Sequence, residues 1–154
     1  PPSTPDEFRL SPRQPYTSSV AYLFFSGNTE FNASSDTLLL YNDEVVGPEP
    51  RFPSFPYSDW VSAGPQPDPP AVVSVLVRME ARSRYLADFS VSSDGAATYQ
   101  VTVTGAEGAG TFSRESGGQH ILVALEASTT GYVRINLSAS RTVVFHNVVV
   151  TRIS

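Results

Sequence analysis

Three consecutive stretches near the C-terminal end of the sequence alternate apolar and polar residues, with turn residues between them. They are residues 120–126, 132–138 and 142–153. A β-strand points successive side chains to opposite faces, so a period of two predicts strands with one buried and one solvent-facing side. Between the first two stretches the sequence is Ala-Ser-Thr-Thr-Gly, at 127–131. These turn residues predict a hairpin.

The third stretch changes phase part-way along. Val143 and Phe145 alternate in one phase, and Val148 and Val150 alternate in the other, with the dipeptide 146–147 at the change. A β-bulge at this dipeptide explains the change, and so does a strand that is buried on both faces. The sequence leaves both interpretations open.

Strand patterns also cover much of the preceding sequence. No stretch has a persuasive helical period, and turn residues separate the patterns at regular spacing. About eight to ten strands of this kind predict an all-β fold, a two-sheet antiparallel β-sandwich of the jelly-roll type. The further patterns occupy residues 7–10, 18–26, 37–41, 72–82, 84–92, 98–104 and 110–114.

The length of 154 residues suits a single domain, which we expect to span residues 7–154. Residues 1–6 begin Pro-Pro-Ser-Thr-Pro and resemble the tail of a Pro-rich linker. We therefore expect the chain to be a processed or excised piece of a larger polypeptide, joined through this linker to a neighbouring domain.

Charge and composition exclude several classes of partner. The net charge is −5 and the ten basic side chains, all arginine, are scattered, which argues against binding to a phosphate backbone. No apolar run has the roughly 20 residues needed to span a bilayer, and none resembles a signal peptide. The absence of cysteine rules out disulfides and thiolate metal sites. We expect no nucleic acid, no membrane and no cofactor among the partners.

Residues 47–70 form a long insertion between the strand patterns. They contain eight of the 13 prolines, too many for a regular element. The part from residue 52 to residue 60 is aromatic, and it includes Trp60 and Tyr57. These two rings can stack on a sugar ring while Asp59 or Arg51 forms hydrogen bonds with its hydroxyl groups. The alternatives are a lid over the sandwich and a contact with another protein.

The polar faces of the late strands are a second candidate binding site. Gln100, Arg134 and Asn136 lie on such faces, and Arg78 and Glu80 join them if their strands are neighbours. A sheet face of this kind can bind an extended glycan, and it can equally be a solvated surface.

No catalytic or metal-binding motif is present. His120 and His146 are the only histidines, and with Asp88 they have the residue types of a metal or general-base site, but nothing in the sequence places them together. No nucleophile elbow, phosphate loop or zinc spacing occurs. We therefore expect no catalytic residues and no metal site.

The strand order and the closing segment 132–153 resemble the terminal strands of non-catalytic carbohydrate-binding modules and related extracellular β-sandwich domains. The last strand of those modules commonly has an apolar pair, a polar or acidic pair and then alternating valines, as residues 144–150 have here. Such modules often carry an aspartate where this chain has His146 and Asn147. The resemblance therefore carries over neither a calcium site nor any other family binding residue.

The function predicted from the sequence is a non-enzymatic binding module for a polysaccharide or glycan, secreted and extracellular or surface-displayed. The alternative is a structural or assembly domain of a surface appendage, capsid or phage particle. In that role the chain would form a homo-oligomer with closed symmetry.

Overall fold

The structure is a computed structural model of the whole chain. It describes residues 7–13, 16–18, 21–27, 29–42, 71–106, 110–114 and 117–153, which form twelve strands and no helix. The described residues thus offer no helix long and apolar enough to cross a membrane. The linker expected at 1–6 and the proline-rich insertion 47–70 lie outside the described residues.

Six antiparallel strands make up the first sheet, called sheet A. Five of them have the order β10-β7-β12-β5-β4, and β1 also pairs with β12. The strands are β1 (Glu7–Leu10), β4 (Thr29–Asn32), β5 (Thr37–Leu40), β7 (Ser83–Ser93), β10 (Gly117–Ala127) and β12 (Val143–Arg152).

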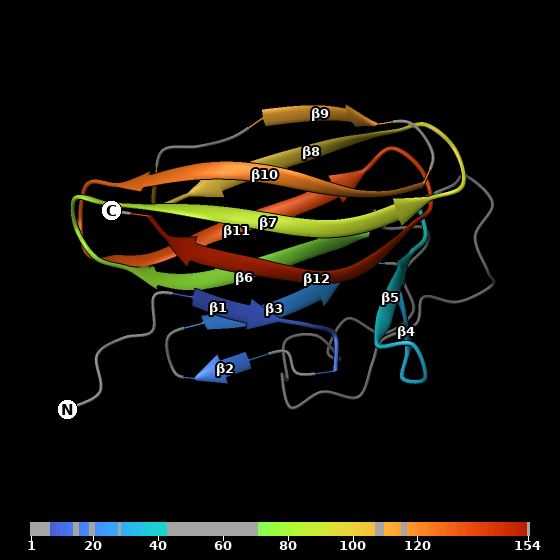
Figure 1. Cartoon of the computed structure of the whole chain (residues 1–154), viewed down its shortest axis with the longest axis horizontal. Helices are drawn as coiled ribbons and strands as arrows, with labels where there is room; N and C mark the ends of the chain where they lie inside the picture. Colours follow the sequence, from blue (N-terminus) through green and yellow to red (C-terminus); the bar gives the residue numbers. More distant parts are fainter. Residues whose placement is uncertain are drawn as a thin grey trace.

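Sheet B contains the other six strands, in the order β2-β3-β6-β11-β8-β9 and also antiparallel. The two sheets lie face to face, and from β6 onward the chain changes sheet at every step except between β8 and β9 (Figure 1). The predicted all-β jelly-roll sandwich is confirmed. The strands are β2 (Tyr16–Ser18), β3 (Ala21–Ser26), β6 (Val72–Met79), β8 (Ala97–Thr104), β9 (Gly110–Arg114) and β11 (Gly131–Ala139).

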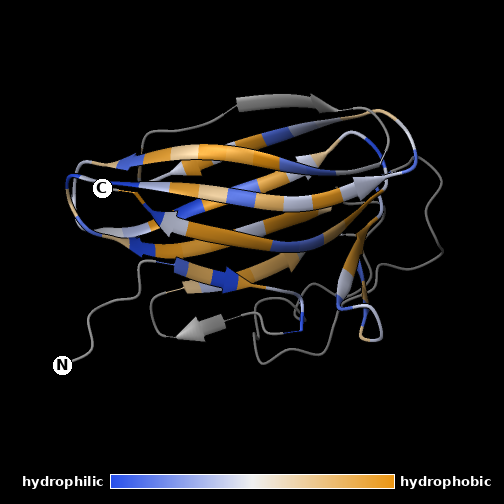
Figure 2. Ribbon diagram, in the orientation of Figure 1, coloured by the Kyte–Doolittle hydropathy of each residue, from blue (hydrophilic) through white to orange (hydrophobic). Residues whose placement is uncertain are grey.

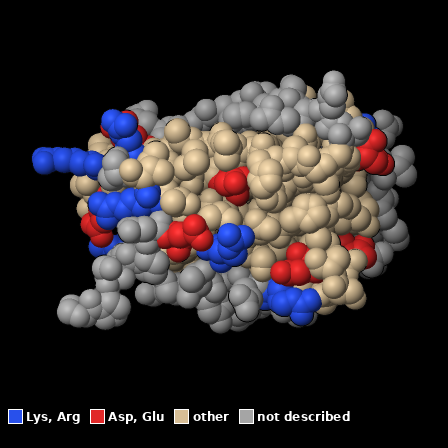
Figure 3. All heavy atoms as spheres, in the orientation of Figure 1, with Lys and Arg blue, Asp and Glu red and all other residues tan. Residues whose placement is uncertain are grey.

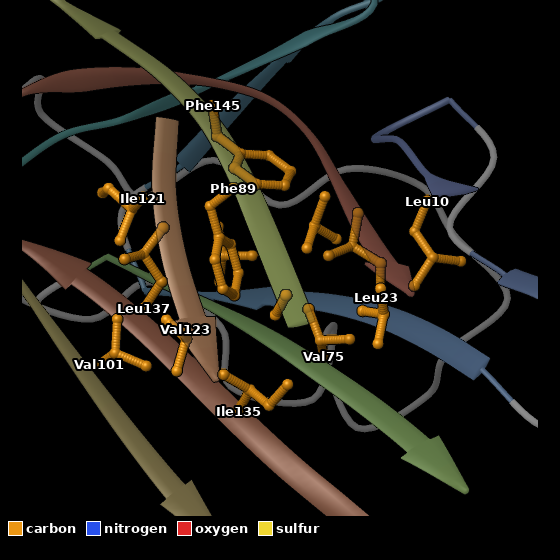
Figure 4. Packing of buried hydrophobic residues seen from close by; sticks show 14 of the residues in the cluster. Leu10, Leu23, Val75, Phe89, Val101, Ile121, Val123, Ile135, Leu137 and Phe145 are labelled. Carbon is orange, nitrogen blue, oxygen red and sulfur yellow. The ribbon is translucent and has the colours of Figure 1, made fainter. Parts of the chain in front are cut away.

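The space between the sheets is filled by alternate side chains of the long strands. Hydrophobic residues alternate with hydrophilic ones along these strands (Figure 2). Phe89 and Phe145 from sheet A meet Leu137 and Val75 from sheet B in one buried cluster (Figure 4). All four side chains have no exposed surface. The period of two read from the sequence thus identifies the buried face of each long strand.

The prediction of a hairpin at residues 127–131 is wrong. β10 pairs with β7 in sheet A, whereas β11 pairs with β6 and β8 in sheet B, so the turn carries the chain across the sandwich. Turn residues reverse the chain equally well within a sheet and between two sheets. Only the pairing partners distinguish the two, and those come from strands far away in the sequence.

The phase change in the last strand is a β-bulge. The register between β12 and β7 shifts between Phe145 and Asn147, while Phe145 and Val148 both face the core and are fully buried. Two residues therefore separate consecutive core positions, where a regular strand would have one. This observation decides between the two interpretations that the sequence left open.

Short strands account for the difference between the expected eight to ten strands and the twelve that the described residues form. The stretch expected as one strand at 18–26 contains parts of two, β2 and β3, and β4 was not predicted. β4 has only four residues and is defined by its pairing with β5. Its sequence, Thr-Glu-Phe-Asn, is too short to show a period.

Two neighbouring residues on β10 test the register of the core. Ile121 is completely buried. Leu122 points away from the core and is 51% exposed. Ile121→Ala should lower the free energy of unfolding by about 2–5 kcal/mol, because it removes buried methyl groups and leaves a cavity. Leu122→Ala should change it by roughly 0.5 kcal/mol or less, as expected of a surface substitution. Urea unfolding measures both.

Two results of this comparison between Ile121→Ala and Leu122→Ala would contradict the described register. A shift of β10 by one residue against the core would reverse the order of the two effects, because every side chain would move to the other face. Equal losses from the two variants would contradict the described burial.

Candidate functional site

The candidate site lies on the outer face of sheet B, where β6, β11 and β8 are adjacent. On the middle strand, β11, the even-numbered residues from Tyr132 to Ser138 face outward, because Val133, Ile135 and Leu137 are buried. Directly opposite residues of an antiparallel pair share a face. The outward-facing side chains of the three strands therefore lie next to one another and form one outer face.

Register places the polar residues of this face next to one another. Asn136 lies between Ser74 on β6 and Thr102 on β8, and Ser138 lies opposite Gln100. Two residues before Asn136 on β11, Arg134 lies between Leu76 on β6 and Thr104 on β8. Thr104 is the last residue of β8. Hydroxyl, amide and guanidinium groups from three strands thus occupy one surface.

This surface is hollowed. An open depression of about 580 Å³ is lined by Val72, Ser74, Gln100, Thr102, Thr104, Arg134, Asn136 and Ser138. A second depression of about 280 Å³ shares Gln100 and Ser138 with it and continues to Thr98 and Ser140. We call the two together the sheet B groove. From Thr104 to Thr98 it follows β8 for about 20 Å, at the usual rise of a strand.

A partly buried hydrogen bond holds one of the lining amides. Ser74 is 4% exposed, and its hydroxyl donates to the side-chain oxygen of Asn136 at 2.6 Å. The amide oxygen of Asn136 is therefore engaged by the protein. Its NH₂ group, which carries two donor hydrogens, is left to interact with a ligand in the groove.

Aromatic side chains lie on the same face of the sheet. Tyr132 is 46% exposed and stands directly opposite Arg78 on β6. On β3, the next strand outward from β6, Tyr22 and Phe24 are partly buried and stack with ring centroids 6.2 Å apart and an angle of 26° between the rings. They stand opposite Leu76 and Ser74 in the register.

A glycine shapes the end of the groove near Tyr132. Gly105 directly follows β8 and has a φ of +97°, in the region that side chains other than glycine rarely adopt. A Cβ atom at this position would lie 2.8 Å from the backbone oxygen of Tyr132. Glycine therefore allows the chain to leave β8 in close contact with β11.

The sequence-predicted site residues divide into two groups. Gln100, Arg134 and Asn136 are brought together in the sheet B groove, and Arg78 lies on the neighbouring strand on the same face. Glu80 follows β6 at the same end of the sheet. The four loop residues Trp60, Tyr57, Asp59 and Arg51 lie outside the described residues, so their role stays a prediction.

Sequence reasoning missed several of the groove residues. Ser74, Thr102 and Ser138 line the groove, and none of them was singled out. These residues alternate with apolar ones along their strands, so the sequence could have placed them on the outward face. Using this pattern required the order β6-β11-β8, which joins strands that are far apart in the sequence.

The histidines lie on the other sheet. His120 and Asp88 are brought together on the outer face of sheet A, with His120 Nδ1 2.7 Å from Asp88 Oδ1. Ser90 Oγ contacts the same ring nitrogen, at 3.3 Å. In a hydrolytic triad the acid and the nucleophile contact different ring nitrogens, so this arrangement lacks the relay geometry.

His146 takes no part in that cluster. Its Nε2 atom lies 2.9 Å from the hydroxyl of Ser92, on the same sheet. Among the described residues, no three His, Cys, Asp or Glu side chains are grouped so that they could hold a metal ion.

A further depression, of about 380 Å³, lies at one end of sheet A. Leu39, Val143 and Val144 supply most of its apolar lining, and Ser92, Ser93, Asp94 and Thr142 supply its polar groups. Asp94 is engaged by Arg141, whose Nη2 atom lies 3.3 Å from its carboxylate. This depression has fewer uncommitted hydrogen-bonding side chains than the sheet B groove.

Neither a family model nor a curated protein matches the sequence. Solved structures do match the fold. One is the C-terminal CBM6 of LamC, a marine laminarinase from Zobellia galactanivorans. It has a TM-score of 0.52 and 10% identity over 94% of this chain and 98% of that one. The fold is similar to that of a carbohydrate-binding module.

A second similar structure is a family two carbohydrate esterase from Cellvibrio japonicus. It has a TM-score of 0.50 and 13% identity over 96% of this chain. The match covers only 34% of the esterase chain, so this chain corresponds to about a third of that enzyme. At these identities the likeness concerns the fold.

The bond between Ser74 and Asn136 gives a testable prediction. Ser74→Ala should lower the free energy of unfolding by about 0.5–1.5 kcal/mol, the usual net value of one hydrogen bond. Ser138→Ala is the matched control, because Ser138 lines the same groove and forms no side-chain hydrogen bond among the described residues. Thermal or urea unfolding of both variants makes the comparison, and an equal change in the two would contradict the proposed positioning of Asn136.

Proposed function

We propose that this chain is a non-catalytic module that binds a polysaccharide or glycan in the sheet B groove. The observation that carries the proposal is the groove itself, an open depression of about 580 Å³ lined by hydroxyl, amide and guanidinium groups from three neighbouring strands. Its elongated form suits an extended chain of sugars better than a single small molecule.

The chemistry of the lining suits a ligand rich in hydroxyl groups. The amide of Gln100 offers both a donor and an acceptor, and Asn136 and Arg134 offer further donors. Sugars also have apolar C–H faces, and the exposed ring of Tyr132 at one end of this surface offers a partner for stacking. Main-chain pairing fixes the backbone positions that carry these side chains before the ligand arrives, which reduces the entropy lost on binding.

The fold supports the same proposal. One similar structure is a CBM6 of a laminarinase and another is a carbohydrate esterase, and the names of both refer to carbohydrates. For this chain we propose binding without catalysis, in a secreted, extracellular or surface-displayed protein.

The aromatic insertion remains part of the proposal. Trp60 and Tyr57, with Asp59 and Arg51, would add a second contact with the glycan by stacking and hydrogen bonding. The insertion and the groove are tested by separate variants.

The decisive experiment compares variants of the two candidate sites. A panel of soluble polysaccharides is screened by affinity electrophoresis, and affinities for the ligands found are measured by isothermal titration calorimetry. Gln100→Ala and Asn136→Ala should each weaken binding about tenfold, equivalent to roughly 1.4 kcal/mol. Glu126→Ala is the control, because Glu126 is exposed on the outer face of sheet A.

Other outcomes would redirect the proposal. Full affinity in both groove variants, with binding lost in Trp60→Ala, would place the site in the insertion. Absence of binding to any glycan, together with a mass in sedimentation that rises with concentration, would favour the structural or assembly role in a homo-oligomer.

A further inference from the structure

We infer that the glycan bound in the sheet B groove is acidic, bearing carboxylate or sulfate groups that Arg134 and Arg78 recognise. The inference rests on the proposed function and concerns the class of ligand. It starts from the distribution of charge between the two sheets.

Charge is segregated between the sheets. The whole sequence has 15 acidic and 10 basic residues, with a net charge of −5. Yet the six strands of sheet B contain no aspartate or glutamate, and their only charged residues are Arg78, Arg114 and Arg134. Sheet A carries all the acidic residues found within strands, which are Glu7, Glu30, Asp88 and Glu126. An acidic protein thus has one sheet whose strand charges are all positive.

Arg134 and Arg78 have no counter-ion among the described residues. Elsewhere in the described part, the arginines at 9, 13 and 141 lie within 4.0 Å of a carboxylate, whereas those at 82, 84 and 152 also lack an ion pair among the described residues. Arg134 and Arg78 are exposed, and neither forms such a pair. Glu80, two residues beyond Arg78, forms no ion pair with it. Among the described residues, therefore, no carboxylate competes with an outside anion for either guanidinium group.

The two arginines are close enough to act on one ligand. Arg78 lies opposite Tyr132, and Arg134 follows Tyr132 by two residues on β11, so the arginines occupy diagonal positions on the same face. Diagonal positions on adjacent strands are about 7–8 Å apart, within reach of long side chains. Like charges at this distance repel each other, and an anion bound between or beside them relieves that repulsion.

Guanidinium chemistry suits an acidic sugar. The planar group has five N–H donors, and it can bind a carboxylate or a sulfate through two parallel hydrogen bonds. A neutral hydroxyl accepts a hydrogen bond but supplies no opposite charge. The negative net charge of the protein does not prevent binding, because charges further away than about 10 Å are largely screened at 0.1 M salt.

The experiment uses the full chain and pairs of polymers that share a sugar backbone, with one charged and one neutral member in each pair. The first pair is polygalacturonate and its methyl-esterified form, and the second is dextran sulfate and dextran. We expect the acidic member of at least one pair to bind at least tenfold more tightly than its neutral partner, and its affinity to fall as salt is raised. The first pair reports recognition of carboxylate and the second recognition of sulfate.

Variants assign the effect to the groove. Arg134→Gln should weaken binding of the acidic polymer about tenfold, and Arg78→Gln should also weaken it. Arg134→Lys, which keeps the charge but loses the paired donors, should retain part of the affinity. Arg84→Gln is the matched control, because Arg84 is an exposed arginine on sheet A and should leave the affinity unchanged. Circular dichroism checks that each variant is folded.

Three results would overturn the inference in different ways. If neutral and acidic polymers bind equally and Arg134→Gln weakens both alike, the ligand is a neutral glycan and the proposed function stands without the inference. If the acidic polymers bind but Arg84→Gln weakens them as much as Arg134→Gln does, the attraction is not specific to the groove. If neither these polymers nor any polysaccharide of the panel binds, the proposed function and the inference fail together.

Discussion

The apolar layer between the two sheets is the constraint on which the rest of the structure depends. Each long strand contributes alternate side chains to this layer, and the residues between them must then face outward. On β11, Val133, Ile135 and Leu137 are buried. Because side chains alternate along a strand, Arg134 and Asn136 must face outward. The core thus fixes the direction of every side chain that the candidate site uses.

Adjacent strands turn these fixed directions into a site. Residues 74, 100 and 136 are separated widely in the sequence, and each alone is an ordinary polar residue of a strand. The order β6-β11-β8 brings them to one surface, and the hydrogen bond from Ser74 orients Asn136 within it. The chemical character of the groove is therefore a property of three strands together, held in place by main-chain pairing.

The two outer faces differ in ways that suit different roles. Sheet A carries both acidic and basic residues in its strands, as well as both histidines, although charged side chains are sparse across the middle of its outer face (Figure 3). Its polar groups also pair among themselves, as His120 does with Asp88 and His146 with Ser92. On sheet B the guanidinium groups of Arg78 and Arg134 have no such partner among the described residues. Because the strands of sheet B contain no aspartate or glutamate, its positive charges are not offset within the sheet, and this face is the better candidate for an anionic ligand.

The sequence by itself determined the all-β class, the buried face of the long strands that precede the last one, and the polar nature of Gln100, Arg134 and Asn136. These follow from a period of two, which is a local property of the chain. Tertiary structure alone decided which strands are neighbours, because pairing joins segments far apart in sequence. It showed that the turn at 127–131 connects two sheets, that residues 146–147 form a bulge, and that Ser74, Thr102 and Ser138 share a groove with the predicted residues. The local pattern determines which side chains of a strand face the core. Only long-range pairing determines which strands lie next to one another.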